Sequence, residues 1–317
     1  MKKNMSILTF GIALVLLIVL SACLQEDDSS TKEKIVRIGY QKNCPFVILK
    51  GLGTLEEALE PLGYEVEWKL FQEGPELTEA LNAGSIDIGR TGNTPVVFAQ
   101  AAKTPFVTLA AGAPKFHGSG ILVPEDSTIT SVEDLQNQRI SFAKGSSSHY
   151  LLVKALEEAG IDYGDIEPAL LPPGEARVAF EKGNVDAMVV WDPFTASTEL
   201  FSNGRLLITG EGLTTDRDFF VATQDFVENH KEIADIVIEE VDKSSQWAND
   251  HHEELVQMLA PILDIDEMAI EKAVERREYG VDDITADIIS EQQDIADTLY
   301  DMDIIPEKMD VREVMEY

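Results

Sequence analysis

Apolar and polar residues follow two periods along this chain, one typical of strands and one typical of helices. From Ile35 onward, short runs rich in β-branched and aromatic residues predict ten strands, at 35–40, 64–70, 86–89, 106–111, 120–123, 139–142, 168–171, 187–190, 206–208 and 219–223. Between most of these runs the apolar residues recur at helical spacing, most clearly at 75–83 and 147–159. Strands that alternate with helices predict α/β lobes with largely parallel sheets.

The pattern changes after about residue 225, where only helical periods are found. They include segments 227–247, 253–259 and 285–299. Helices that follow two strand-rich blocks are expected to pack onto one existing lobe, and we predict the first lobe. About 285 residues remain for folding once the N-terminal segment is set aside, more than a single core usually organises, so two lobes are expected.

The N-terminal segment has the composition of a secretory signal peptide. Two lysines precede an apolar run from Ile7 to Leu20. This run is shorter than the roughly 20 residues that a membrane-spanning helix needs. Residues 1–22 are therefore predicted to be removed on export.

The residues just before Cys23 resemble a bacterial lipobox. This resemblance implies lipidation of the Cys23 thiol and a mature protein anchored to the cell membrane from its outer side. Cleavage by an ordinary signal peptidase is the alternative. Residues 23–34 have no helical or strand period and are predicted to form a tether.

The formal charge of −33 excludes nucleic acid as a partner, because nucleic-acid-binding proteins need a basic surface. An anionic ligand would have to be bound against this overall field by strong local donors. Either a saline or alkaline exterior or simple lineage bias would account for the acidity. The chain has two cysteines, Cys23 and Cys44, and five scattered histidines, so no disulfide, metal centre or cofactor is expected.

Three junctions between a strand and a helix are rich in small polar residues: TGNTP at 91–95, KGSSSH at 144–149 and LPPGEAR at 171–177. Ligands of α/β folds bind at the carboxyl ends of strands, where helix N-termini offer backbone N–H groups. The hydroxyls of Thr91, Ser146 and Ser147 would add uncharged donors, which suits an anion. Plain helix capping explains each junction taken alone, but one capping residue would suffice where three serines stand.

A fourth feature is WDPF at 191–194, which directly follows an apolar strand. Trp191 could form an apolar wall for a ligand or pack at a lobe boundary, and Asp192 is placed to cap the next helix. Phe219 and Phe220 could extend the wall or lie in the core.

Several longer segments together are similar to one known family. They are RIGYQK at 37–42, ALNAGSIDIGRTGNTPVVFAQAA at 80–102, ILVPEDS at 121–127, KGSSSHYLLVKALEEAG at 144–160, LPPGEARVAFEKGNVDAMVVWDPF at 171–194 and EQQDIADTLYDMDIIPEKMDV at 291–311. By their order and spacing the chain resembles the aliphatic sulfonate-binding proteins of ABC importers, from about Val36 to Val314.

This resemblance implies a two-lobed periplasmic-binding-protein fold of type II. Two crossovers are expected near Gly118–Ile121 and Thr215–Phe220, with residues 35–118 plus 221–317 in the first lobe and 119–220 in the second. The residues expected to bind the ligand are Gln41, Thr91, Gly92, Asn93, Gly118, Ser119, Ser146, Ser147, His149, Trp191, Asp192 and Phe219.

Two residues depart from the family pattern as the resemblance presents it. Cys44 stands in a loop where a small or apolar residue is expected. Arg90 precedes TGN where relatives commonly have an aromatic residue. We predict that Arg90 points outward, toward surface acid, because it alternates with buried Ile88 and follows Gly89 where the strand ends. The alternative is an inward Arg90 that supplies local positive charge to the cleft.

The resemblance implies a monomeric binding protein that closes on an alkanesulfonate and then docks on an ABC permease with its ATPase subunits. A cleft with donors and no acceptor would favour sulfonate over a protonated phosphate. Taurine is an alternative ligand, whose amine would be bound by Asp192 or Glu175. Nitrate and a thiamine-precursor pyrimidine are further alternatives. A biosynthetic enzyme of this fold and a structural surface protein are more distant alternatives.

Overall fold

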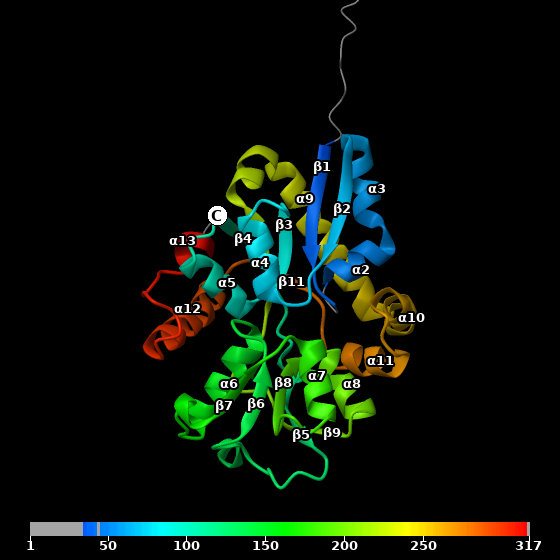
Figure 1. The fold of residues 1–317 in the computed structure, drawn as a ribbon. Coiled ribbons are helices and arrows are strands. Elements are labelled where there is room, and N and C mark those ends of the chain that lie inside the picture. Colours follow the sequence, from blue (N-terminus) through cyan, green and yellow to red (C-terminus); the bar gives the residue numbers. More distant parts are fainter. Residues whose placement is uncertain (1–33, 43–44, 316–317) are drawn as a thin grey trace, which may run out of the picture. The chain divides into compact units, whose positions relative to one another are not determined.

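The computed structural model describes residues 34–42 and 45–315 (Figure 1). The predicted signal peptide, the predicted lipidation site at Cys23 and the departure at Cys44 lie outside the described residues. No helix in the described part of the chain is both long and apolar enough to cross a bilayer. The fold is α/β and two-lobed, and each lobe is built on one sheet.

The first lobe contains a six-stranded sheet in the order β11-β4-β10-β3-β1-β2. Its strands are β1 (Lys34–Tyr40), β2 (Tyr64–Leu70), β3 (Ile88–Gly92), β4 (Phe106–Gly112), β10 (Asp218–Thr223) and β11 (Val281–Asp282). Strands β1 and β3 are parallel, whereas β10 runs antiparallel to both of its neighbours. The expectation of largely parallel sheets is therefore only partly right.

Helices cover both faces of this first sheet, because its strands are apolar on both sides. Along β10, Phe220 and Ala222 join the core beneath one face, while Phe219 and Val221 join the core beneath the other. The helices on the Phe220 face are α2 (Pro45–Leu52), α3 (Thr54–Leu59), α9 (Gln224–Asp250) and α10 (His252–Leu263). Those on the Phe219 face are α4 (Gly74–Asn82), α5 (Asn93–Ala101), α12 (Ala286–Asp301) and α13 (Arg312–Met315).

The second lobe contains a five-stranded sheet in the order β7-β6-β8-β5-β9, which lies in the green part of the ribbon in Figure 1. Its strands are β5 (Ser119–Pro124), β6 (Arg139–Phe142), β7 (Glu167–Leu170), β8 (Ala187–Trp191) and β9 (Gly204–Thr209). Its helices are α6 (Ser147–Glu158), α7 (Pro173–Glu181) and α8 (Phe194–Phe201). Strand β5 runs antiparallel to β8 and β9, while β6 is parallel to β7 and β8.

The chain passes between the two sheets twice. It leaves the first sheet after Gly112 and enters the second at Ser119, and it leaves the second after Thr209 and returns at Asp218. Phe219 and Phe220 therefore belong to the first lobe. Their assignment to the second lobe was wrong by a few residues, because an apolar strand gives no sign of which sheet it joins.

The C-terminal helices pack on the first lobe, as predicted, but one of them also contacts the second lobe. Helix α11 (Glu267–Glu275) packs against α10 and places Ile270 and Val274 in the first-lobe core, while its Ala269 and Ala273 form a small buried cluster with Ala196 of α8. Strand β11 also interrupts the C-terminal region that the sequence predicted to be purely helical; it pairs with β4. Small residues allow two helices to approach closely, and their partner cannot be read from the sequence.

Candidate ligand-binding site

Two small cavities lie side by side where the two lobes meet, at the carboxyl ends of several strands. Each has a volume of about 20 Å³, and Arg90, Lys115 and Trp191 line both. The first cavity is lined in addition by Gln41, Gly74, Gly92, Pro95, Ser146, Ser147 and Asp216. The second cavity is lined in addition by Gly118, Ser119, Asp192, Ala273 and Arg277.

The N-termini of three helices converge on the first cavity. Gly74 begins α4, Gly92 is the N-cap of α5, and Ser146 is the N-cap of α6. None of these three helices has an N-cap side chain that accepts a hydrogen bond from its first turn. Elsewhere, α9, α11 and α12 are each capped by a side chain, whereas α3, α7 and α10 are not, so what distinguishes the site is that three such N-termini meet at one cavity.

Helix N-termini leave backbone N–H groups without helical partners and carry a partial positive charge of about half a unit each. In α5 the Thr94 N–H already donates to Oδ1 of Asn93 at 2.7 Å and Pro95 has no N–H, so this helix contributes mainly through its partial charge. The hydroxyl of Ser146 does not cap its helix, because it donates to the carbonyl oxygen of Ala143 at 2.7 Å. The explanation of this junction as simple capping therefore fails. The first lobe, through α4 and α5, and the second lobe, through α6, thus both direct helix N-termini at a cavity where an anion can bind.

A buried group of charged side chains lies beside both cavities. The Arg90 guanidinium pairs with Asp218 and donates to Oε1 of Gln41 at 3.2 Å. The Lys115 Nζ atom lies 2.6 Å from Oδ2 of Asp216 and 3.6 Å from Oδ1 of Asp218. These contacts link both crossovers, which contain Lys115 and Asp216, to the first sheet.

The predicted outward orientation of Arg90 is wrong, since the residue is only 5% exposed. Residues two apart on a strand share one face, so Arg90 follows Ile88 inward rather than alternating with it. Strand β3 lies between β1 and β10, and all five of its residues are buried. The buried Arg90 guanidinium is tolerated here because it forms an ion pair with Asp218.

The pKa of Lys115 is lowered to about 8. Burial is the main cause, because it disfavours the charged ammonium form, and the neighbouring Arg90 and Arg277 act in the same direction, against Asp216. Lys115 thus keeps most of its charge at neutral pH but loses it at moderately alkaline pH. An anion in the first cavity would stabilise the charged form.

Asn93 connects the two lobes rather than lining a cavity. Its Oδ1 atom accepts from Oγ of Ser147 at 2.8 Å, and its Nδ2 atom donates to Oγ1 of Thr214 at 3.4 Å. The residue thus joins the start of α5 to the start of α6 and to the second crossover. Gly92 allows this approach, because a Cβ atom there would lie 2.3 Å from the Ser147 hydroxyl.

The WDPF segment contributes two residues to the site. Trp191 is partly exposed and lines both cavities, and its role as an apolar wall for a ligand stays a prediction. Oδ1 of Asp192 accepts from the backbone N–H of Ala196 at 2.9 Å, as predicted for a residue that stabilises the first turn of α8. The pKa of Asp192 is raised to about 7, mainly by burial and against the effect of Arg276.

The structure does not bring Thr91, His149 or Phe219 to either cavity. His149 is buried inside the second lobe, where Nδ1 accepts from the Gly145 N–H at 3.2 Å and Nε2 contacts the Tyr163 hydroxyl. Its pKa is lowered to about 4, mainly by burial. Thr91 is fully buried behind Gly74, and Phe219 lies in the core of the first lobe.

Sequence reasoning missed four charged residues at the site: Lys115, Asp216, Asp218 and Arg277. Asp216 lines the first cavity and Asp192 the second, so both cavities contain a carboxylate as well as donors. Asp218 stands immediately before the apolar run FFVA, which was a usable signal because a charge at the start of a buried strand needs a buried partner. Arg277 carried no such signal.

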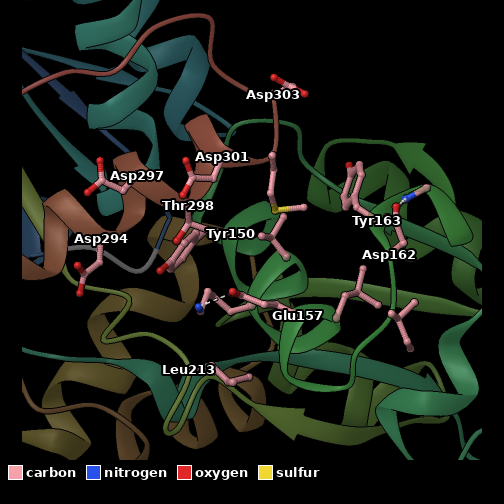
Figure 2. A pocket seen from close by; sticks show the side chains of 16 residues that line it. Tyr150, Glu157, Asp162, Tyr163, Leu213, Asp294, Asp297, Thr298, Asp301 and Asp303 are labelled. Carbon is pink, nitrogen blue, oxygen red and sulfur yellow. Dashed lines mark hydrogen bonds and ion pairs between the residues drawn. The ribbon is translucent and has the colours of Figure 1, made fainter.

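A larger cavity, with a volume of about 810 Å³, lies elsewhere, between α6 and α12. Figure 2 shows Asp294, Asp297 and Asp301 along one wall and Glu157 and Asp162 along the other. Carboxylates on both walls would repel an anion. Among the described residues, no set of three His, Cys, Asp or Glu side chains is placed to hold a metal ion.

The fold and site define a class, the two-lobed substrate-binding proteins of ABC importers. Residues 52–200 match the family described as "ABC transporter, phosphonate, periplasmic substrate-binding protein". The alkanesulfonate-binding protein SsuA from Xanthomonas axonopodis pv. citri, solved with bound MOPS, has a similar structure, with a TM-score of 0.85 and 33% identity, covering 89% of this chain and 97% of that protein.

Curated relatives narrow the class to one family. The chain is 34% identical to an aliphatic sulfonates-binding protein of Escherichia coli K12 over 286 residues, which cover 90% of this chain and 89% of the relative. It is 31% identical to the protein of that name in Bacillus subtilis 168, over all of this chain and 95% of the relative. The chain therefore belongs to the family of aliphatic sulfonate-binding proteins of ABC importers.

Proposed function

We propose that this protein captures aliphatic sulfonates outside the cell membrane and delivers them to an ABC permease and its ATPase subunits, as a source of sulfur. It does so as a monomer anchored by a lipid on Cys23. The observation that supports anion capture best is the convergence of three uncapped helix N-termini on a cavity lined also by Arg90 and Lys115.

The arrangement suits an anion that stays charged at every physiological pH. Sulfonates meet this condition, and their three oxygens can accept hydrogen bonds from the starts of α4 and α6 next to the partial charge of α5. Trp191 provides an apolar surface for the alkyl chain, next to the anion. Binding requires no chemical step, and the relatives described above are likewise named as binding proteins.

Capture requires the lobes to move, because each cavity of about 20 Å³ has room for about one water molecule. In the proposed cycle the contact between Asn93 and Ser147 opens, the sulfonate enters, and the lobes close over it. The permease then recognises the closed form. Ligand binding shifts the balance between the two forms by its difference in affinity for them.

The test is a thermal-shift and calorimetry screen of residues 24–317 against ethanesulfonate, methylphosphonate, sulfate and nitrate. A sulfonate at a hundredfold excess over its dissociation constant should stabilise the protein by about 2.7 kcal/mol. The variant Gln41→Ala should bind it more weakly, whereas Gln136→Ala, at an exposed position, should not. A response to methylphosphonate or nitrate without one to sulfonates would contradict the proposal.

The anchoring part of the proposal has its own test. The full-length protein should fractionate with membranes and gain a lipid label, and the variant Cys23→Ala should lose both properties. Release of the unchanged full-length protein as a soluble form would instead support cleavage by an ordinary signal peptidase.

A further inference from the structure

Asp192 has a buried carboxylate oxygen whose role is not explained by the fold. The residue is only 7% exposed, and its Oδ1 atom accepts from the Ala196 N–H and lies 3.6 Å from Nη1 of Arg276. The second oxygen, Oδ2, is buried and has no hydrogen-bond partner among the described residues. Such an oxygen is costly unless a donor meets it in some state of the protein.

The free oxygen faces the second cavity. Gly118 lies directly opposite, and a Cβ atom on it would come within 2.7 Å of Oδ2, so the glycine keeps the space beside the carboxylate open. Arg90, Lys115 and Trp191 line both cavities, so the second cavity is adjacent to the first and is the nearest space for the far end of a molecule whose anion occupies the first.

Of the described residues, Asp192 is the only carboxylate that lines the second cavity, and its nearest cation, Arg276, lies 3.6 Å from the other carboxylate oxygen, Oδ1, and also pairs with Glu199 of α8. Oδ2 therefore has no donor among the described residues, and an ammonium group at the far end of the ligand would supply one.

We propose that the preferred ligands are alkanesulfonates with a terminal ammonium group, and that this group donates a hydrogen bond to Oδ2 of Asp192. The inference rests on the proposed function, since the sulfonate end must occupy the first cavity. Glu175, the other carboxylate considered from the sequence, is exposed and lines neither cavity, so it cannot take this role.

Calorimetry on pairs of ligands with the same carbon chain tests the proposal. Ethane-, propane- and butanesulfonate are compared with the corresponding ω-aminoalkanesulfonates at pH 7.5. This pH lies between the pKa of Asp192, about 7, and that of Lys115, about 8, so both groups are mostly charged. At least one amino ligand should bind about tenfold more tightly than its partner, as a hydrogen bond to a charged group predicts.

Two variants show whether Asp192 causes this preference. Asp192→Asn should abolish the preference for the amino ligand, while the plain sulfonate should bind at least as tightly as it does to the wild type, because a negative charge is removed from the site. Asp126→Asn, the same change at an exposed position, should leave both affinities unchanged. Retention of the Ala196 hydrogen bond by asparagine keeps the first turn of α8 intact.

The outcomes separate this inference from the proposed function. Tighter binding of every plain sulfonate, or an undiminished amine preference in Asp192→Asn, would overturn the role of Asp192 and leave sulfonate capture standing. Failure of both ligand series to bind would overturn the proposed function itself.

Discussion

Lys115 carries the positive charge at the site that is easiest to remove by experiment. Its ammonium group lines both cavities, and its pKa is about 8, whereas Arg90 and Arg277 remain charged throughout the usual pH range. Asp216, Asp218 and, across the second cavity, Asp192 are the acids that face it. We expect the affinity for a sulfonate to fall once the pH exceeds 8.

The size of this effect follows from the fraction of Lys115 that is charged. If only the ammonium form binds the anion, a group with a pKa of about 8 makes the dissociation constant rise about 25-fold between pH 7.5 and 9.5. Ethanesulfonate has no group that titrates in this range. Asp192, with a pKa of about 7, is already mostly ionised at pH 7.5 and contributes little to the change.

Isothermal calorimetry with ethanesulfonate at several pH values measures the profile. The variant Lys115→Met should bind more weakly at pH 7.5 and show a nearly flat profile up to pH 9.5. The control Lys103→Met removes a lysine whose side chain is 78% exposed, and it should keep the wild-type profile. A circular-dichroism spectrum at each pH checks that the fold is intact.

A dissociation constant that stays the same from pH 7.5 to 9.5 in the wild type would refute the reasoning. It would mean that the Lys115 charge does not act on the bound anion. An equal pH dependence in the wild type and in Lys115→Met would show that the titration of another group causes the loss of affinity.

Three further changes test other parts of the structure. Gly92→Ala places a Cβ atom 2.3 Å from the Ser147 hydroxyl and should weaken ligand binding about fivefold, the loss of roughly one hydrogen bond between the lobes, as measured by calorimetry. Glu199→Gln removes the carboxylate that pairs with Arg276 and should lower the free energy of unfolding by about 1–3 kcal/mol in urea. The pKa of Asp192 is raised to about 7 in the folded state. The protonated carboxyl therefore stabilises the wild type fully below about pH 4, and this stabilisation is lost as the pH rises through 7. Asp192→Asn, which cannot ionise, should raise the melting temperature relative to the wild type more at pH 8 than at pH 5.

Matched controls exist for each of these variants. Gly174→Ala adds a methyl group where nothing lies within 4 Å, and Glu60→Gln and Asp126→Asn change exposed side chains. Binding of Gly92→Ala as tight as that of Gly174→Ala would contradict the role given to the contact between Gly92 and Ser147. Equal unfolding of Glu199→Gln and Glu60→Gln would show that the link between α8 and α11 adds no stability.

Strands were the part of the fold that the sequence predicted best. All ten predicted runs form strands close to the expected bounds, because apolar, β-branched runs between turn residues have few alternatives to a buried strand. Which of the two sheets a strand joins was harder to predict. Phe219 and Phe220 were placed in the wrong lobe, since hydrogen bonding between strands depends on segments far away in the chain.

The candidate site was predicted in part. Eight of the twelve expected residues line the two cavities: Gln41, Gly92, Gly118, Ser119, Ser146, Ser147, Trp191 and Asp192. Strand-to-helix junctions and the WDPF segment point to these positions because both lie at the carboxyl edge of a sheet. Whether all of them contact a ligand stays a prediction.

The sequence by itself determined the strands, the two-lobed α/β class and the junctions at which ligands can bind, because local periods and turn residues specify these features. Only the tertiary structure decided which charges meet there. Arg90, Lys115 and Arg277 come from a strand, a crossover and the end of a helix, and they share the acids Asp216 and Asp218. Such a group depends on distances between segments far apart in the chain, which no local pattern encodes.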